Sequence, residues 1–316
     1  MNLTKKQEYE LLASISARGE IPDKFTYLNG GWKLWDKTYT QRAQKGGKAY
    51  DERELLADHI NSFVNVFAKP KGINLIDLGC GNGKPVIPII EVLQREKIAV
   101  NYVPVDISSA MIDLAIKNLF EKFSDLSIKK LVIDFEKESL ADALLDIKQQ
   151  NNYPSFLVNL GNTLGNYINT SAVLTNFLES MTLDDYLVIG NGLANDYNTQ
   201  KILVSYNKYD EENVTLPAKS LGIYDSGDKF NWVWNNAKNR VEGRIKLNTD
   251  KSVTLAGQNV NLEAGEELLV MRSNKYSESS LTKLLSDVGF RTELLTTTKN
   301  RNEIIAMVQP TRYSVV

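Results

Sequence analysis

Short apolar stretches alternate with segments of helical periodicity over most of the first 190 residues. The apolar stretches predict strands, and the segments with apolar positions three and four apart predict helices. The predicted strands are 74–78, 101–105, 129–133, 156–160 and 186–190, and the predicted helices are 52–67, 86–94, 110–123, 140–149 and 171–181. Strands joined by helical crossovers pair in parallel, so this pattern predicts an α/β sheet.

The pattern changes between residues 196 and 270. Turn signals such as DSGD and NTDKS separate short alternating stretches there, which is typical of antiparallel strands. A helix at 278–288 and strands at 291–296 and 303–308 then restore the α/β pattern. No helix separates these two last strands, so they must pair antiparallel. The middle segment is therefore predicted to be an insertion into one α/β domain.

Composition narrows the class of protein. The chain has 316 residues, 42% of them hydrophobic, and a formal net charge of −2. Nucleic-acid binders usually carry a basic stripe, so we expect no nucleic-acid partner. No apolar run approaches the roughly 18 residues of a membrane span, and the N-terminus is too polar for a signal peptide. We therefore expect a cytoplasmic protein without membrane contact. A monomer is our expectation for the oligomeric state, although no sequence feature indicates it.

The chain has one cysteine, Cys80, and one histidine, His59. An internal disulfide is impossible, and a Cys/His metal site cannot be assembled, so no metal is expected. His59 lies in a helical apolar pattern and is interpreted as a helix residue at the edge of the core. Cys80 is interpreted as a small loop residue without a nucleophilic role.

The stretch LIDLGCGNGKPVIPII carries the main candidate chemistry. A strand containing Asp77 leads into Gly79, Gly81 and Gly83, and helical periodicity then resumes. Dinucleotide enzymes, P-loop proteins and methyltransferases all use such a glycine loop. No Lys-Ser or Lys-Thr follows the glycines in the Walker arrangement, which disfavours a nucleoside triphosphate as the ligand. The glycine spacing is Gly-x-Gly-x-Gly and not the Gly-x-Gly-x-x-Gly of dinucleotide-binding proteins.

Acids end the next two predicted strands. Asp106 stands 23 residues after Gly83 (106 − 83), where a carboxylate can accept both hydroxyls of a ribose. Asp134 and Phe135 follow the third strand, and they could accept from an adenine amine and supply an apolar wall. Any one of these acids could instead cap the following helix. Their occurrence in order at successive strand ends favours a nucleoside-containing cofactor.

The glycine spacing resembles motif I of the class I S-adenosylmethionine-dependent methyltransferases. This resemblance implies a Rossmann-like α/β fold with a seven-stranded sheet whose last strand is antiparallel. It also implies S-adenosyl-L-methionine as the cofactor. The implied cofactor-binding residues are Asp77, Gly79, Gly81, Gly83, Asp106, Asp134 and Phe135.

A narrower resemblance links the chain to the histidine-specific methyltransferase family, which N-methylates amino acids. The stretches YVPVDIS, NLGNTLGNY, KFTYLNGGWKLWD, ILVSYN and AGEELLVMRSNKYS are similar to blocks of that family. The resemblance implies a substrate domain that is built from an N-terminal segment and the insertion, which is expected to be an α+β segment. The expected division is 1–53 and 196–273 for the substrate domain, and 54–195 and 274–316 for the methyltransferase core.

The same resemblance implies roles in binding an amino-acid substrate. Asn166 and Tyr206 would hold the carboxylate, with Tyr209 as a competing match for Tyr206. Gly161 would approach the amine, Tyr27 and Tyr50 would line the amine and side-chain end, and Ser273 would belong to the pocket. Tyr27 and Asn166 would position the substrate, and we name no catalytic acid or base. As alternatives, Asn166 could be a turn residue, and the tyrosines could wall a core.

Two positions depart from the family. Met271 replaces a glutamate that binds imidazole, and Gly243 replaces a methionine. Methionine is a poor acceptor for an imidazole N–H, so the pocket is expected to be roomier and less polar. We therefore expect an aromatic or apolar amino acid, or a derivative, rather than histidine. The alternatives are histidine itself, with Glu266 or Glu267 replacing the missing acid, an unrelated small molecule methylated on O or N, and a cofactor-binding regulatory protein.

Overall fold

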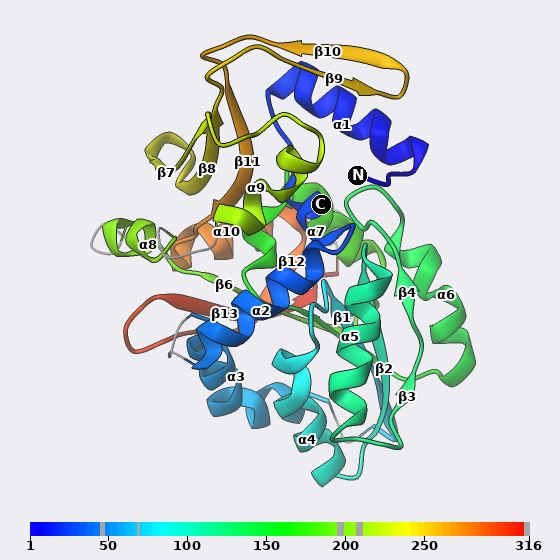
Figure 1. The fold of residues 1–316 in the computed structure, drawn as a ribbon. Helices are drawn as coiled ribbons and strands as arrows, with labels where there is room; N and C mark the ends of the chain where they lie inside the picture. Colours follow the sequence, from blue (N-terminus) through cyan, green and yellow to red (C-terminus); the bar gives the residue numbers. More distant parts are fainter. Residues whose placement is uncertain (45–47, 68–69, 195–198, 207–210, 313–316) are drawn as a thin grey trace. The chain divides into compact units, whose positions relative to one another are not determined.

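The chain forms two compact units in the computed structural model (Figure 1), which describes residues 1–44, 48–67, 70–194, 199–206 and 211–312, with side chains except at 42–51. The smaller unit comprises Met1–Thr38 and Asn195–Lys275, and the α/β unit comprises Tyr39–Ala194 and Tyr276–Val316. The sequence predicted domain boundaries after residues 53, 195 and 273, and the two units in the structure are divided after residues 38, 194 and 275. The first expected boundary lies within α3 (Lys48–Asn65).

The α/β unit is built on one mixed sheet of eight strand segments. Their order is β12-β13-β6-β5-β1-β2, and the short β3 and β4 both pair with β2 at the edge, so seven strand positions are filled. The segments from β1 to β6 pair in parallel, whereas β13 pairs antiparallel with both β6 and β12. The predicted class I fold with its antiparallel last strand is confirmed. The strands are β1 (Gly72–Leu78), β2 (Ala99–Asp106), β3 (Ser127–Ile128), β4 (Leu131–Val132), β5 (Ser155–Asn159), β6 (Tyr186–Gly192), β12 (Phe290–Thr297) and β13 (Glu303–Pro310).

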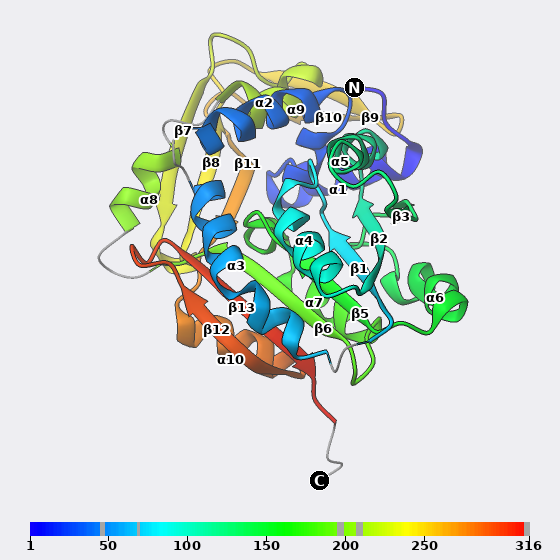
Figure 2. The same ribbon diagram turned by 90° about the horizontal axis from the view of Figure 1, so that it is seen from below.

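Helices cover both faces of this sheet (Figure 2). Alternate residues of β1 enter two different cores: Ile73 and Leu75 join the cluster under α3, α4 and α5, and Ile76 and Leu78 join the cluster under α6, α7 and α10. Burial on both faces explains why the strand sequences are almost continuously apolar. The helices are α3, α4 (Ile87–Arg95), α5 (Ser109–Phe120), α6 (Leu140–Asn151), α7 (Thr170–Glu179) and α10 (Glu278–Val288), with 3-10 turns η2 (Lys84–Val86) and η3 (Thr163–Asn166).

The smaller unit contains the predicted antiparallel strands. The strands β7, β8 and β11 form a three-stranded sheet, and β9 and β10 form a hairpin against which α1 packs through Leu11 and Ile15. The elements are α1 (Lys5–Arg18), η1 (Asp23–Tyr27), α2 (Gly31–Gln44), which continues into the other unit, α8 (Thr199–Tyr206), α9 (Glu211–Ser220), β7 (Lys229–Asn235), η4 (Asn236–Lys238), β8 (Arg240–Lys246), β9 (Lys251–Leu255), β10 (Gln258–Leu262) and β11 (Glu267–Asn274).

The insertion is α+β, because the helices α8 and α9, for which no residue ranges were predicted, precede the predicted antiparallel strands. Both helices are short, and α9 contains Pro217. Helices of this length are marginal in isolation, so tertiary packing must stabilise them. Buried residues such as Ile202, Tyr206 and Ala218 supply that packing.

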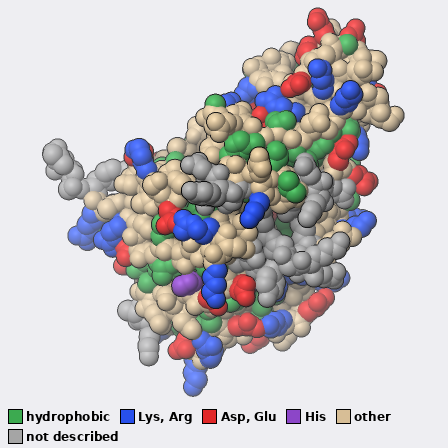
Figure 3. All heavy atoms as spheres, turned by 90° about the vertical axis from the view of Figure 1, so that its left-hand side faces the viewer, with side chains coloured by type: hydrophobic (Ala, Val, Ile, Leu, Met, Phe, Trp, Pro, Cys, Tyr) green, Lys and Arg blue, Asp and Glu red, His purple; other side chains and the backbone are tan. Residues whose placement is uncertain are grey.

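No helix in the described ranges combines the length and apolar character that crossing a membrane requires. On the face drawn in Figure 3, basic and acidic side chains are interspersed.

The glycine loop makes a prediction about stability. Gly83 has φ 70°, and a Cβ there would lie 3.0 Å from Ala115 Cβ and 3.1 Å from Ala115 Cα on α5. Gly257 in the β9–β10 turn has φ 78° but no atom within 4 Å of such a Cβ. Gly257→Ala should therefore cost about 1–2 kcal/mol from the left-handed backbone alone. Gly83→Ala should cost about 1–3 kcal/mol more, because it also overpacks the helix contact.

Urea unfolding of both variants and the wild type measures this difference. Equal losses of unfolding free energy would show that the loop does not depend on its close approach to α5.

Candidate functional site

The glycine loop opens at the carboxyl end of β1. The N–H groups of Gly79 and Cys80 both donate to the Val105 carbonyl of β2, at 2.8 and 3.3 Å. Gly79, Gly81 and Gly83 have φ values of 72°, 52° and 70°, a region that strains any other residue. The loop therefore keeps a bare backbone at the sheet edge where α/β proteins bind their ligands.

Asp106 ends β2 beside this loop. It is 8% exposed, and its Oδ1 accepts the Ser108 N–H at 2.9 Å. Burial raises the pKa of Asp106 to about 6, while hydrogen bonds from the backbone N–H groups of Ser108, Gly81 and Ile107 oppose that rise. The carboxylate is thus mostly ionised at neutral pH, and it can accept the hydroxyls of a ribose.

Asp77 lies one strand away, inside β1. Its Oδ2 accepts the Tyr102 hydroxyl at 2.7 Å, and the residue is 4% exposed. Burial raises the pKa of Asp77 to about 7; the Tyr102 hydrogen bond opposes this, and the nearby Asp106 carboxylate adds to it. In this structure Asp77 links β1 to β2 beneath the loop, and its contact with the cofactor stays a prediction.

Asp134 and Phe135 lie in the turn after β4, which ends at Val132. The Asp134 carboxylate accepts the Glu136 N–H at 3.2 Å. The Phe135 ring packs edge-on against Tyr167, with centroids 5.7 Å apart, and its tip lies 4.0 Å from the position of a Cβ on Gly79. Phe135 is thus a core residue that also borders the glycine loop.

The loop after β5 approaches the same place. Thr163 Cγ2 lies 3.2 Å from the Cβ position of Gly79, so this loop and the glycine loop are neighbours. Asn166 ends η3, and its buried Oδ1 has no hydrogen-bond partner among the described residues. The Gly161 N–H donates to the Glu52 carboxylate, so this group is already engaged.

Two buried residues of this region escaped the sequence interpretation. Asn159 ends β5 fully buried, donates to the Leu78 carbonyl at 2.9 Å and to the Tyr167 hydroxyl at 2.8 Å, and leaves Oδ1 without a described partner. Glu52, on α3, is 3% exposed. The amide that ends the apolar stretch SFLVN could have identified Asn159 from the sequence as a candidate site residue. Nothing in the helical pattern distinguished Glu52 from its exposed neighbours.

In the smaller unit, one face of the three-stranded sheet gathers four predicted substrate residues. Gly243 of β8 pairs with Trp232 on one side and Met271 on the other, and Ser273 lies further along β11. The Tyr206 hydroxyl of α8 donates to Ser273 Oγ at 2.8 Å, and its ring lies 5.2 Å from the Trp232 ring. Tyr206, Gly243, Met271 and Ser273 therefore share one neighbourhood.

The expectation that Gly243 opens extra room is wrong. A Cβ on Gly243 would lie 3.0 Å from Trp232 Cζ3 and 3.2 Å from Phe230 Cε2. The two aromatic rings already occupy the space that a side chain would take. The surface beside Met271 is apolar, as expected, but it is filled rather than empty.

Neither alternative acid faces Met271. Glu266 is exposed and accepts the N–H of Glu263 within its own turn, at 2.9 Å. Glu267 is exposed and pairs with Arg244 at 3.5 Å. The alternative in which one of them folds inward to replace the missing glutamate is therefore wrong.

The remaining predicted residues are placed as follows. Tyr27 ends η1, donates its hydroxyl to Asp23 at 3.3 Å and packs edge-on against Trp35. The side chain of Tyr50 and all of Tyr209 lie outside the described part of the chain. Lys275, which the sequence did not single out, is 2% exposed and donates to Ser273 Oγ at 2.9 Å.

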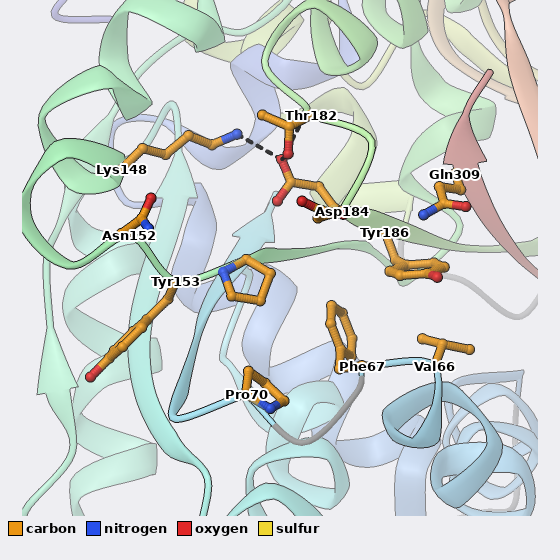
Figure 4. Close-up of a pocket in the computed structure, with 12 residues that line it drawn as sticks. Val66, Phe67, Pro70, Lys148, Asn152, Tyr153, Thr182, Asp184, Tyr186 and Gln309 are labelled. Carbon is orange, nitrogen blue, oxygen red and sulfur yellow. Dashed lines mark hydrogen bonds and ion pairs between the residues drawn. The ribbon is translucent and has the colours of Figure 1, made fainter. Parts of the chain in front are cut away.

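A hollow of about 500 Å³ lies at the opposite ends of the strands of the main sheet. Figure 4 draws the residues that line it. The hollow lies where β5 and β6 begin, between Phe67, Tyr153 and Tyr186. Lys148 at its rim donates to the Asp185 carboxylate at 2.7 Å. The acids and glycines described above lie at the other ends of the strands, so this hollow is separate from the candidate site.

Neither Cys80 nor a metal-binding cluster contributes to the candidate site among the described residues. Cys80 is buried, and burial raises the pKa of its thiol well above the usual range, which keeps it protonated. The described ranges contain no cluster of three or more His, Cys, Asp or Glu residues suited to a metal ion.

Known proteins are similar to this chain in sequence or in fold. The N-methyltransferase imqF of Aspergillus flavus is 22% identical over 305 residues, which cover 90% of this chain and 79% of that protein. The magnesium protoporphyrin IX methyltransferase of Synechocystis PCC 6803, solved with bound SAH, has a TM-score of 0.50 at 14% identity, covering 90% of this chain and 96% of its own. A likeness at such low identity concerns the fold alone, which is that of the class I methyltransferases.

The family assignment comes from the sequence as a whole. The match to the family described as histidine-specific methyltransferase, SAM-dependent, extends over residues 7–310 and so includes the glycine loop, Asp106 and the strands around Met271. The chain therefore belongs to the histidine-specific methyltransferase family and is an S-adenosylmethionine-dependent methyltransferase.

Proposed function

We propose that this protein transfers a methyl group to the α-amine of a free amino acid or a derivative, with aromatic or apolar side chains preferred over histidine. The observation that carries the proposal is the sheet face on which Tyr206, Ser273, Gly243 and Met271 lie together. The relative from Aspergillus flavus is an N-methyltransferase, which supports nitrogen as the acceptor atom. A monomeric, cytoplasmic protein without a nucleic-acid partner stays a prediction.

The α/β unit offers a fitting set of groups for the cofactor. An ionised Asp106 suits the ribose, the bare backbone of Gly79, Gly81 and Gly83 suits the methionine part, and Phe135 with Asp134 suits the adenine. S-adenosylmethionine supplies a methyl group on a positively charged sulfur. The protein contributes orientation and exclusion of water, which together can supply much of the rate enhancement.

The substrate must present a neutral amine, whose lone pair forms the new N–C bond as the S–C bond breaks. We propose that Tyr27 and Asn166 orient this amine and that Asn166 and Tyr206 hold the carboxylate. The buried Oδ1 of Asn166 is an acceptor without a described partner, which suits an amine N–H, while its amide group can donate to a carboxylate. The Tyr206–Ser273 hydrogen bond would fix the tyrosine hydroxyl in place.

The apolar surface next to Met271 supports the preference in side chain. Trp232, Phe230 and Met271 offer no strong acceptor there, so an imidazole N–H buried against them would lose about 1–3 kcal/mol. An apolar ring gains roughly 25 cal/mol for each Å² that it buries. Both effects favour an aromatic or aliphatic amino acid over histidine.

Asp106→Ala should weaken S-adenosylmethionine binding by about 1.5–3 kcal/mol, because hydrogen bonds to a charged acceptor are lost. Isothermal titration calorimetry measures the change. Asp113→Ala is the matched control, because Asp113 is exposed on the adjoining helix α5. Unchanged affinity in Asp106→Ala would contradict the assignment of the ribose site.

Asn166→Ala should raise the KM for the amino acid about tenfold or more and leave cofactor affinity nearly unchanged, since it removes substrate hydrogen bonds worth about 1–3 kcal/mol. In the wild type, decarboxylated analogues should be poor substrates. Steady-state kinetics with paired amino acids and amines tests both points. Equal turnover of the amines would refute the carboxylate assignment.

Met271→Glu should shift kcat/KM toward histidine by about tenfold or more, because it restores a charged acceptor beside the side-chain surface. Met271→Leu is the control, since it keeps the surface apolar. A competition assay with histidine, tryptophan, tyrosine and leucine measures the preference. A wild type that methylates histidine best would show that the pocket is not as proposed.

A further inference from the structure

A buried carboxyl group holds the turn that follows β5. Glu52, near the start of α3, directs both oxygens at the Gly161 N–H, with distances of 2.8 Å from Oε2 and 3.0 Å from Oε1. Glu52 is 3% exposed, whereas Gly161 is exposed. Gly161 has φ 77°, so the turn relies on a left-handed glycine and on this anchor beneath it.

The neighbouring strand is shaped to admit Glu52. A Cβ on Gly190 of β6 would lie 1.9 Å from Glu52 Oε1, so only glycine leaves room for the carboxylate. A second buried acid, Glu303 at the start of β13, lies close enough to influence its ionisation. Asn162, next to Gly161, donates to Glu303 Oε2 at 3.1 Å and accepts the N–H of Gly192. Helix α3 and strands β6 and β13 therefore all hold this one turn.

The charge of Glu52 depends on pH in an accessible range. Burial raises the pKa of Glu52 to about 8, the Glu303 carboxylate adds to the rise, and the Gly161 hydrogen bond opposes it. Glu52 is thus mainly neutral at pH 7. Above pH 8 the Glu52 side chain is mainly ionised, a state that its burial and the neighbouring Glu303 side chain both disfavour.

Burying a carboxyl group such as that of Glu52 reduces the free energy of unfolding unless its hydrogen bonds offset the lost hydration. Buried acids with shifted pKa values at the ligand edge of a sheet are typical of functional sites. The turn that Glu52 holds leads directly to Thr163, which lies beside the glycine loop, and to Asn166.

We propose that Glu52 is a positioning residue for methyl transfer, which fixes the Gly161 turn and through it the loop that carries Asn166. This inference rests on the proposed role of Asn166 in binding the substrate. Glu52 acts through the backbone and does not itself touch the substrate.

Three variants test the inference kinetically. Glu52→Ala removes the anchor, and we expect at least a tenfold rise in substrate KM and less than a threefold change in the Kd for S-adenosylmethionine. Glu52→Gln keeps an acceptor for the Gly161 N–H, and we expect kcat/KM within threefold of the wild type at pH 7. Glu54→Ala, an exposed glutamate on the same helix, should match the wild type. Unchanged KM in Glu52→Ala would overturn the proposal.

The pH profile separates positioning from simple stability. The ratio of kcat/KM for Glu52→Gln to that of the wild type should rise at least threefold between pH 7 and pH 9, because only the wild type gains a buried charge at position 52. The titration of the substrate amine cancels in this ratio. A constant ratio would overturn the proposed ionisation of Glu52 within the anchor.

The free energy of unfolding depends on Glu52 over a lower pH range than the activity ratio does, and it falls as the pH rises. Because the folded-state pKa is raised, the contribution of Glu52 is fully present below its unfolded value of 4.5 and is lost as pH rises through 8. The melting temperature of the wild type should therefore fall relative to that of Glu52→Gln between pH 5 and pH 8. The same pH trend in both proteins would contradict a neutral, buried Glu52.

Amide hydrogen exchange tests the anchor without any substrate. At pH 7 the peptide that spans residues 160–167 should exchange at least tenfold faster in Glu52→Ala than in Glu54→Ala, because Glu52→Ala removes the acceptor of the Gly161 N–H. Equal exchange in Glu52→Ala and Glu54→Ala would overturn the anchor. If Glu52→Ala exchanges faster but the wild type methylates no amino acid, the anchor is supported and the proposed function is rejected instead.

Discussion

Backbone N–H groups that stabilise buried carboxyl groups hold together the ligand edge of the main sheet. Asp106 accepts from the backbone around its own turn and from Gly81, and Glu52 accepts from Gly161. In each case a loop that leaves a parallel strand is tied to an acid whose burial would otherwise be unfavourable. The glycines are essential to this arrangement, because they let the backbone turn its N–H groups toward the acids without a side chain in the way.

Burial and backbone hydrogen bonds also distinguish the acid suited to bind the cofactor from the acids that support the loops. Asp106 has a pKa of about 6 and carries a charge at neutral pH, whereas Asp77, with a pKa of about 7, and Glu52, with a pKa of about 8, are progressively less ionised. Three carboxyl groups in one region thus differ in charge because they differ in the number of backbone donors and in the nearby acids. Only the first is well suited to accept hydroxyl groups of a nucleoside throughout the neutral range.

The smaller unit uses aromatic packing where the α/β unit uses polar contacts. Trp232 and Phe230 lie over Gly243, and Tyr206 packs against Trp232 while its hydroxyl reaches Ser273. An apolar wall with a few fixed hydroxyl groups at one end is the arrangement expected for a small amphipathic ligand. Replacing Gly243 by a larger residue would displace Trp232 before it changed the shape of a pocket.

The sequence by itself determined the α/β order of strands and helices, the antiparallel final pair, the glycine loop and the positions of Asp106 and Asp134. These features depend on local periodicity and on residues at strand ends, so they can be read along the chain. Only the tertiary structure decided that α8 and α9 form, that Trp232 fills the space at Gly243, and that Glu52 lies buried beneath Gly161. The burial of Glu52 depends on partners far away in the sequence, and neither the helical pattern around Glu52 nor its charge indicates a burial that Gly190 and Glu303 make possible. Trp232 and Gly243 are close in sequence, but their contact depends on the register of β7 and β8, which local periodicity does not fix.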